Sequence, residues 1–455
     1  MNNLNFLVDV LKDSPVFKTL EKNVKPGRTV CASGLSTINK SNIIYALCRL
    51  KGVTAFCLAS DEKEAQTLCN DLSCMGLRAY VYPVRDFNFL DFQSRSHEYE
   101  HARLKVLLKL LNHECDVAIA CVDAAAQLTV PRNVLEQSVI EFEEGRELSL
   151  EKATKALTLL GYERFDAVEG SGQFSLRGGI LDFFMPDSDY PVRCEFWGDE
   201  ITDLSYFDIE TQRRFKKADK ITLSPSTEIG IEDRAALADK IEHKAKLLRS
   251  KNSAKAKEKL FSEAELIRSG AMIANADKFI NQIYDKPESL FDYLDRNTLV
   301  FASEFTAIQE RGKSMDFISN ETLMQGFEDG TLCRGFDRFA LTFNECTEFL
   351  QSHGTIVLEN FVHGSMPIKL SEIISFSTKQ LSAWGGSYKQ LKEDVDGLFT
   401  PESKGVIFAG TERAAKNLCD TFNADGINAV YSEGADKISK GELLVMQGAL
   451  SAGFE

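Results

Sequence analysis

Residues 28–52, RTVCASGLSTINKSNIIYALCRLKG, join an apolar run to a short loop and a long helical pattern. The run from Val30 to Ala32 predicts a buried strand, and the apolar residues that recur up to Gly52 predict the helix after it. Residues 1–25 also have apolar residues at helical spacing. Three further strands are predicted, each separated from the next by a helical pattern, at 53–60 (VTAFCLAS), 78–83 (RAYVYP) and 116–124 (DVAIACVDA). This alternation predicts a parallel sheet covered by helices.

The pattern changes near residue 138. From there to Phe207 short strands dominate, separated by Gly-Gly, Pro-Asp-Ser-Asp and Gly-Asp-Glu turns, which predicts an inserted antiparallel domain. Lys-rich helical sequence follows, NTLVFASE (297–304) predicts a return to the parallel sheet, and a last α/β unit is predicted from Gly354. The predicted fold class is therefore α/β. Its domains are a parallel domain in two parts (1–137 and 226–345), the β-rich insert (138–225) and a small C-terminal α/β domain (350–455).

Length and composition limit the kind of protein. A chain of 455 residues has room for several domains, and no apolar run approaches the length of about 18 residues that a membrane span needs. The eleven cysteines are scattered and form no C-x-x-C pair, which favours free thiols in a reducing compartment. We therefore expect a cytoplasmic protein with no membrane partner.

Charge argues against nucleic-acid binding by this chain alone. The formal net charge is −15, which disfavours a surface that wraps nucleic acid. The lysines between Lys240 and Lys259 alternate with Glu242 and Glu258, and this mixture favours a solvated helical face over a nucleic-acid patch.

The loop at residues 34–41 differs from a phosphate-binding loop at one position. The P-loop pattern is G-x-x-x-x-G-K-[ST], and the chain has Gly34, four residues, Asn39, Lys40 and Ser41. Lys40 and Ser41 stand where a phosphate contact and a magnesium ligand belong. Asn39 tolerates positive φ better than most residues, but its side chain lies where the backbone must approach phosphate.

A second part of such a site is also altered. Hydrolysis needs a carboxylate at the end of another strand to hold magnesium. The best candidate strand is LVFASE (299–304), where Ser303 occupies the expected position of the aspartate and only Glu304 follows. Two separate changes predict the remnant of a nucleotide site, without hydrolysis.

Other catalytic patterns are weak. HEYEH (97–101) matches the zinc motif H-E-x-x-H, but Arg95 and Arg103 flank it and no third ligand follows at a recognised spacing. We expect a chance match, with no metal site. The sequence contains no nucleophile elbow and no dinucleotide fingerprint, so no catalytic residue is predicted.

One strand of the insert has a mixed outer face. In VRCEFW (192–197) the period of two places Arg193, Glu195 and Trp197 on the side opposite the apolar residues. An arginine beside an aromatic residue is typical of a protein-binding hot spot. Alternatively, Trp197 covers the edge of the core while Arg193 and Glu195 pair with neighbouring residues. Periodicity alone leaves both interpretations open.

The segment around this strand resembles a known family. Phe174, the run RGGILDFFMP (177–186), the run RCEFWGDE (193–200) and FDIETQRR (207–214) resemble the UvrB-homology region. That region is shared by the excision-repair helicase UvrB and the transcription-repair coupling factors (Mfd). The altered nucleotide motifs and the short segment at 83–104, which has no room for the DNA-gripping hairpin of UvrB, favour the N-terminal region of a coupling factor. The ending LLVMQGALSAGFE (443–455) is similar to the close of the third domain in that family.

The resemblance implies a function for the insert. Its core would be helicase-like without ATPase activity, and the insert would recruit the damage-recognition protein UvrA through Arg177, Arg193 and Trp197. The aromatic residue at the position of Trp197 is usually Phe in the family. In the intact protein this surface would be masked until the motor engages stalled polymerase.

The resemblance also implies further domains beyond Glu455. They would bind RNA polymerase, translocate on double-stranded DNA with ATP and magnesium, and regulate the protein, whereas no cofactor is expected for residues 1–455. The alternative is a nucleotide-dependent DNA-repair helicase subunit of the UvrB type, which magnesium-dependent ATP binding through Lys40 would distinguish.

Overall fold

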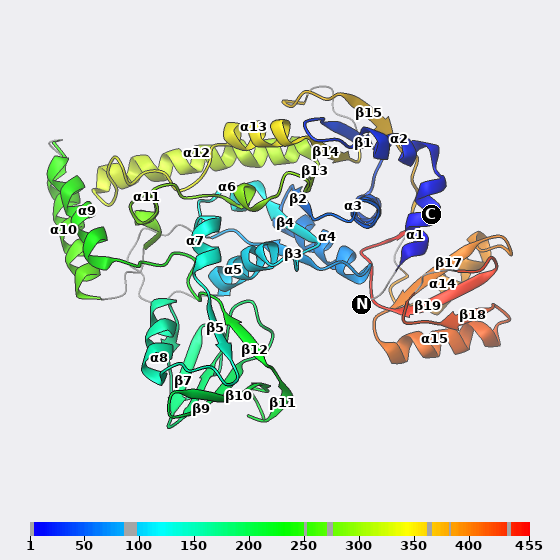
Figure 1. Ribbon diagram of the computed structural model, residues 1–455. Helices are drawn as coiled ribbons and strands as arrows, with labels where there is room; N and C mark the ends of the chain where they lie inside the picture. The colour runs from blue at the N-terminus through cyan, green and yellow to red at the C-terminus, as the bar shows by residue number, and fades with distance from the viewer. Residues whose placement is uncertain are drawn as a thin grey trace.

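A large parallel sheet forms the centre of the molecule (Figure 1). The computed structural model describes residues 4–85, 98–249, 253–270, 276–361, 366–381, 384–434 and 438–455. Within them the sheet has seven parallel strands, in the order β15 (Glu372–Ser375), β1 (Val30–Ser33), β14 (Thr355–Glu359), β13 (Leu299–Ser303), β2 (Ala55–Ala59), β4 (Val117–Cys121) and β3 (Ala79–Tyr82). The predicted α/β fold class and the return of residues 299–303 to this sheet are confirmed.

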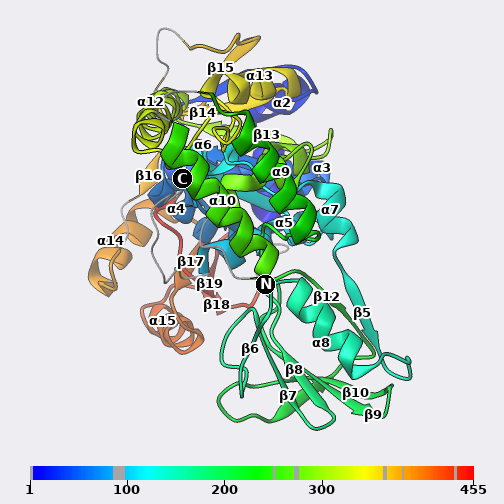
Figure 2. The same ribbon diagram turned by 90° about the vertical axis from the view of Figure 1, so that its left-hand side faces the viewer.

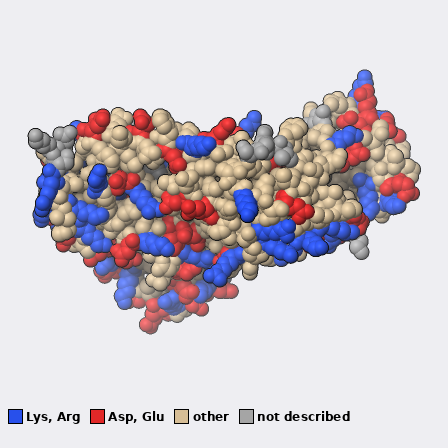
Figure 3. All heavy atoms as spheres, turned by 90° about the horizontal axis from the view of Figure 1, so that it is seen from above, with Lys and Arg blue, Asp and Glu red and all other residues tan. Residues whose placement is uncertain are grey.

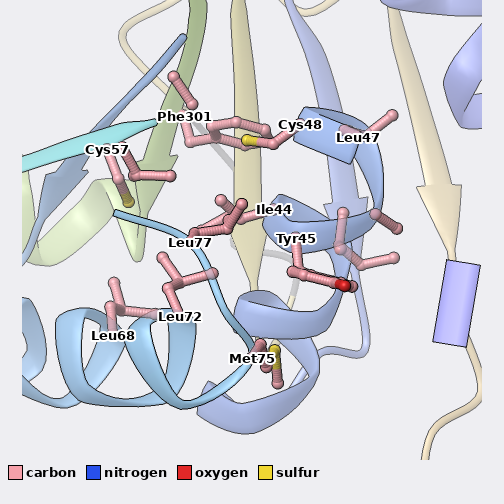
Figure 4. Packing of buried hydrophobic residues seen from close by; sticks show 14 of the residues in the cluster. Ile44, Tyr45, Leu47, Cys48, Cys57, Leu68, Leu72, Met75, Leu77 and Phe301 are labelled. Atoms are coloured by element: carbon pink, nitrogen blue, oxygen red, sulfur yellow. The ribbon is translucent and has the colours of Figure 1, made fainter. Parts of the chain in front are cut away.

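Helices cover both faces of the sheet, which is why its strands are apolar on both sides. One face packs against α1 (Asn5–Asp13), α2 (Pro15–Asn23), α3 (Thr37–Lys51) and α4 (Glu62–Cys74). Figure 4 shows Ile44 of α3 and Leu68 and Leu72 of α4 on the side of these helices that faces Cys57 and Phe301 of the strands. The other face packs against α5 (Glu98–Leu111), α6 (Val122–Ala126), α12 (Phe305–Asp329), α13 (Phe343–His353) and the 3-10 helix η2 (Leu290–Tyr293).

The helix predicted over residues 1–25 is two helices. Pro15 stands at the first position of α2, where its missing N–H costs nothing, and the side chain of Ser14 accepts a hydrogen bond from the Phe17 N–H at 3.4 Å. The chain therefore turns at Ser14, and both helices pack on the same core.

The insert lies apart from the parallel sheet (Figures 1 and 2). Its six-stranded sheet has the order β11 (Arg214–Lys217), β10 (Glu200–Phe207), β9 (Val192–Trp197), β8 (Ile180–Phe183), β7 (Gln173–Arg177) and β6 (Glu163–Arg164). All neighbours are antiparallel except β6 and β7. The helix α8 (Leu150–Leu159) and the antiparallel pair of β5 (Ile140–Glu143) and β12 (Lys220–Leu223) complete its core.

Buried charges join the insert to the parallel domain. Glu228, on the segment that leaves the insert, accepts hydrogen bonds from Arg103 Nε at 2.8 Å, Arg103 Nη2 at 2.9 Å and Thr129 Oγ1 at 2.6 Å. Arg85 lies 3.2 Å from the same carboxylate, and Arg103 is completely buried. Burial alone would raise the pKa of Glu228, but the charges of Arg103 and Arg85 outweigh it and hold this pKa at about 2.

The Lys-rich segment forms a helical hairpin at one end of the molecule (Figure 1). It consists of α9 (Arg234–Leu247) and α10 (Ser253–Ser269), followed by η1 (Ala276–Phe279) and α11 (Ile280–Ile283). Its cations have acidic neighbours: Lys246 lies 3.7 Å from Glu242, and Arg268 lies 2.8 Å from the same residue. Acidic and basic side chains are mixed at the end of the molecule where this hairpin lies (Figure 3, left).

The C-terminal unit is smaller than predicted. Its parallel sheet has the order β17 (Lys404–Ala409), β19 (Glu442–Gln447) and β18 (Ala429–Tyr431), with α14 (Tyr388–Leu398) and α15 (Glu412–Ala424) packed on it. The prediction that this unit begins near Gly354 is wrong for its first strand, because β14 pairs with β1 and β13 in the large sheet. A last short strand, β20 (Gly453–Phe454), pairs with β16 (Gln380–Leu381).

Candidate functional site

The loop after β1 is closed by the protein itself. Gly34 has φ of +79°, and a Cβ atom there would lie 2.1 Å from the carbonyl oxygen of Phe376. The Gly34 N–H donates to Asn360 O at 3.1 Å, and the Leu35 N–H donates to Glu359 O at 3.0 Å. In a phosphate-binding loop, backbone N–H groups of this kind face the ligand. In this protein they bind the last residue of β14 and the residue that follows it.

The helix begins early in the motif. Ser36 precedes the first residue of α3, so Asn39, Lys40 and Ser41 lie inside the helix. The Asn39 side chain donates to Ser36 Oγ at 2.8 Å, and the Lys40 N–H donates to Ser36 O at 2.9 Å. Asn39 does not use the positive φ that its residue type tolerates, because it is an ordinary helical residue.

Carboxylates take the place of phosphate around Lys40, which is 2% exposed. Its ammonium group donates to Glu304 Oε1 at 2.5 Å, to Ser303 Oγ at 3.0 Å and to Glu64 Oε1 at 3.4 Å. Ser303 Oγ in turn donates to Glu64 Oε1 at 2.6 Å. The structure therefore brings Lys40, Ser303 and Glu304 together, and it adds Glu64, which the sequence motifs did not identify.

A third carboxyl group, on Glu359, lies beside this cluster. Burial, together with the charge of Glu304, raises the pKa of Glu359 to about 7. For Glu304 burial acts in the same direction, but the hydrogen bond and charge of Lys40 lower its pKa. Glu304 also lies immediately before α12 and has φ of +56°, an uncommon conformation for a residue other than glycine. The ends of β13 and β14 thus present negative charge where a nucleotide site would receive phosphate.

Ser41 has a different partner from the other motif residues. Its Oγ donates to Asp71 Oδ2 at 3.2 Å, and Asp71 also accepts from the N–H and Oγ of Ser451, both at 2.7 Å. Through Asp71, Ser41 therefore helps to hold the C-terminal segment.

A cavity of about 370 Å³ nearby is lined by residues that include Asp61 and Glu64, but neither Lys40 nor Ser41 lines it.

The outer face of the insert sheet carries the second group of predicted residues. The alternation of β9 is confirmed: Val192, Cys194 and Phe196 are in the core of the insert. Across the outer face, Asp182 of β8 lies opposite Arg193 of β9. Ile180 lies between Arg177 of β7 and Glu195 of β9 in the next row. Arg177, Arg193 and Trp197 therefore share one face.

Asp182 joins the two arginines and was not identified from the sequence. It is 1% exposed and accepts from Arg193 Nε at 2.7 Å, from Arg193 Nη2 at 2.8 Å and from Arg177 Nη2 at 2.8 Å. Arg193 also donates to Gln212 O at 3.2 Å and Gln212 Oε1 at 3.1 Å, and its guanidinium lies 4.4 Å from the centre of the Phe207 ring. An outward-facing aspartate on a strand that precedes Arg193 was the signal that could have indicated it.

Trp197 stands at the turn that joins β9 to β10, and it is 82% exposed. The interpretation in which it covers the edge of the core is therefore wrong. The same interpretation was right about its neighbours, since Arg193 pairs with Asp182 and Glu195 pairs with Arg214. An indole of this exposure on the same face as two arginines has the composition of a binding hot spot.

Other site classes find no support in the described residues. Within those ranges no group of three or more His, Cys, Asp and Glu residues could hold a metal ion. Of the H-E-x-x-H match, His97 lies outside the described residues, and His101 is in α5. No helix in the described part of the chain is long and apolar enough to cross a membrane.

Comparison with known proteins identifies a matching domain family and several relatives. Residues 140–229 match the UvrB interaction domain. The chain is 26% identical over 459 residues to a transcription-repair-coupling factor of Bacillus subtilis (strain 168), a match that covers 98% of this chain and 38% of the relative. It is 25% identical over 396 residues to that of Staphylococcus epidermidis (strain ATCC 12228), covering 83% of this chain and 32% of the relative. For Staphylococcus aureus (strain USA300) the identity is 21% over 463 residues, covering 99% and 39%.

These matches confirm the resemblance that the motifs indicated. The chain spans less than two-fifths of the length of these relatives.

Proposed function

We propose that this chain, which is homologous to transcription-repair coupling factors, is the N-terminal part of one and binds UvrA through its insert. The observation that carries the proposal is the exposed Trp197 on the same outer face as Arg177, in a domain that matches the UvrB interaction domain. Trp197 would bury its indole in an apolar pocket of the partner, and Arg177 would provide charge-assisted hydrogen bonds.

The proposed activity of the whole protein would not be carried by residues 1–455. By its likeness to the coupling factors we propose an ATP- and magnesium-dependent DNA translocase that displaces stalled RNA polymerase from double-stranded DNA and recruits nucleotide excision repair. Residues 1–455 would supply the recruiting surface and no enzyme activity. Their eleven free cysteines support a cytoplasmic location.

Nucleotide binding by the P-loop remnant is disfavoured by geometry and charge. The N–H groups of Gly34 and Leu35 are bound to backbone carbonyls, and the ammonium group of Lys40 is bound to Glu64 and Glu304. A triphosphate would have to break these contacts and approach several carboxylates. The alternative of a UvrB-type nucleotide-dependent helicase subunit is accordingly not favoured. Titration with ATP and magnesium should give no binding, and binding that is lost in Lys40→Ala would revive the alternative.

UvrA binding can be tested on the exposed residues. Trp197→Ala should weaken the affinity for UvrA by about 1–3 kcal/mol, because a hot-spot aromatic loses its buried area. Phe317→Ala is a matched control, since Phe317 is 67% exposed on α12 and outside the insert. Calorimetric titration of purified UvrA with each variant measures the effect. Equal affinities for Trp197→Ala and the unaltered chain would show that Trp197 is not part of the binding surface.

A further inference from the structure

We infer that Asp182 is the positioning residue of this surface, and that Arg193 supports Asp182 instead of contacting the partner. The contact residues would then be Arg177 and Trp197 alone. The inference rests on the proposed function and assigns separate roles to residues that the family resemblance places together. Its starting observation is that Arg193 makes more hydrogen bonds within the protein than Arg177 does.

Arg193 has little left to offer a partner. A guanidinium has five N–H donors. In Arg193, Nε and one N–H of Nη2 donate to Asp182, and the second N–H of Nη2 and one N–H of Nη1 donate to Gln212. Its side chain is 12% exposed and one face of it covers Phe207. A partner could engage Arg193 only by breaking these contacts.

Arg177, unlike Arg193, has N–H donors that a partner could use. Its side chain is 51% exposed, and among the described residues it makes a single hydrogen bond, to Asp182 Oδ2. That bond fixes one end of a long side chain and leaves the other donors directed to solvent. Holding an arginine in one conformation before binding reduces the entropy that the complex must otherwise lose.

Asp182 can do this because it is itself held rigidly. It lies on the central one of three adjacent strands, with Arg177 on one neighbour and Arg193 on the other. Its bidentate pair with Arg193 satisfies both carboxylate oxygens, which offsets the cost of burying the charge. Arg193 thus fixes Asp182, and Asp182 fixes Arg177.

The same geometry indicates which groups a complementary partner surface would carry. Two arginines share one aspartate, so this part of the face keeps an excess positive charge at Arg177. Trp197 lies two strands and one row, or two residues, away from Arg177, roughly 12 Å by strand geometry. The structure therefore fits a partner surface on which a carboxylate lies about that distance from an apolar pocket.

Asp182→Asn tests the inference because it removes the charge and keeps the shape. We expect affinity for purified UvrA to fall at least tenfold, while Asp219→Asn, an exposed carboxylate of the same domain, keeps the affinity of the unaltered chain. A double-mutant cycle separates positioning from general damage. Arg177→Ala should cost less than threefold in the Asp182→Asn background, whereas Trp197→Ala should keep its full effect there.

Arg193→Lys provides a second variant if Asp182→Asn does not fold. It keeps the positive charge but loses the bidentate pair, so binding should weaken and the effect of Arg177→Ala should again shrink. Affinity of Asp182→Asn equal to that of the unaltered chain, or an undiminished effect of Arg177→Ala in that background, would overturn the inference and leave the proposed function intact. An unaltered chain that does not bind UvrA would instead refute the proposed function, and the inference with it.

Discussion

At the scale of single residues, Lys40 stands at the lysine position of the P-loop pattern but is enclosed by carboxylates. Its ammonium group is 2% exposed and lies between the carboxylates of Glu64 and Glu304. The sequence identified Lys40, Ser303 and Glu304 because they stand at fixed positions after strands. The sequence motifs did not predict Glu64, because it lies on α4, a helix whose approach to Lys40 depends on tertiary packing. Motif spacing predicted which residues meet at the end of a sheet, but not which neighbours neutralise them.

Replacement of Lys40 should therefore destabilise the fold. Lys40→Ala leaves two carboxylates without their common cation and should lower the free energy of unfolding by about 2–5 kcal/mol. Urea denaturation followed by circular dichroism measures the difference. Lys63→Ala, at an exposed position on the same helix as Glu64, should leave the stability unchanged. Equal stability of Lys40→Ala and the unaltered chain would contradict a structural role.

Glu359 should make stability depend on pH in the weakly acidic range. Its folded pKa of about 7 lies above its ordinary value of 4.5, so between these values the folded state binds more protons than the unfolded state. Stability from this group is complete below about pH 4.5 and is lost as pH rises through 7. The carboxyl group faces Glu304, Lys40 and the thiol of Cys31, and Glu304 opposes its ionisation.

Glu359→Gln should remove that dependence. Between pH 4.5 and 7 the unaltered chain should lose about 1–3 kcal/mol relative to the variant, measured by denaturation at a series of pH values. Parallel pH profiles of the two proteins over this range would count against the raised pKa.

At the scale of elements, strand periodicity predicted which side chains face outward, but it did not predict which strands pair or in which register. The alternation of β9 places Arg193 and Trp197 on the outer face whatever strand lies beside it. The contact between Asp182 and Arg193 depends on the register of β8 against β9, which neither strand's own pattern contains. For the same reason β14 was assigned to the wrong sheet, because a short apolar strand has the same pattern in either one.

The segments that enter and leave the insert depend on Glu228. Glu228→Gln removes the charge that faces the completely buried Arg103, and it should lower the free energy of unfolding by about 3–5 kcal/mol. Denaturation by guanidinium chloride measures this change. Glu141→Gln is the matched control, because its ion pair with Lys220 is solvent-exposed, and it should unfold with the same midpoint as the unaltered chain. A midpoint for Glu228→Gln equal to that of the control would contradict a central role for the buried cluster.

At the scale of the whole molecule, α3 and α4 connect the parallel domain to the C-terminal unit. Asp71 of α4 binds Ser41 and Ser451, and Leu444 and Met446 of β19 belong to the same core as α3 and α4. The insert lies away from this contact, below the large sheet in Figure 1. A change at Asp71 should therefore affect docking of the C-terminal unit without reaching the proposed UvrA surface.

Asp71→Ala removes three hydrogen bonds, two of them to Ser451, and should cost about 2–3 kcal/mol of local stability. Amide hydrogen exchange in β19 and β20 should become faster, because their docking on α3 and α4 is weakened. Exchange in β8 and β9 and the affinity for UvrA should stay as in the unaltered chain. Asp420→Ala, exposed on α15, should change neither region, and a loss of UvrA affinity in Asp71→Ala would show that the two ends of the molecule are coupled through the parallel sheet.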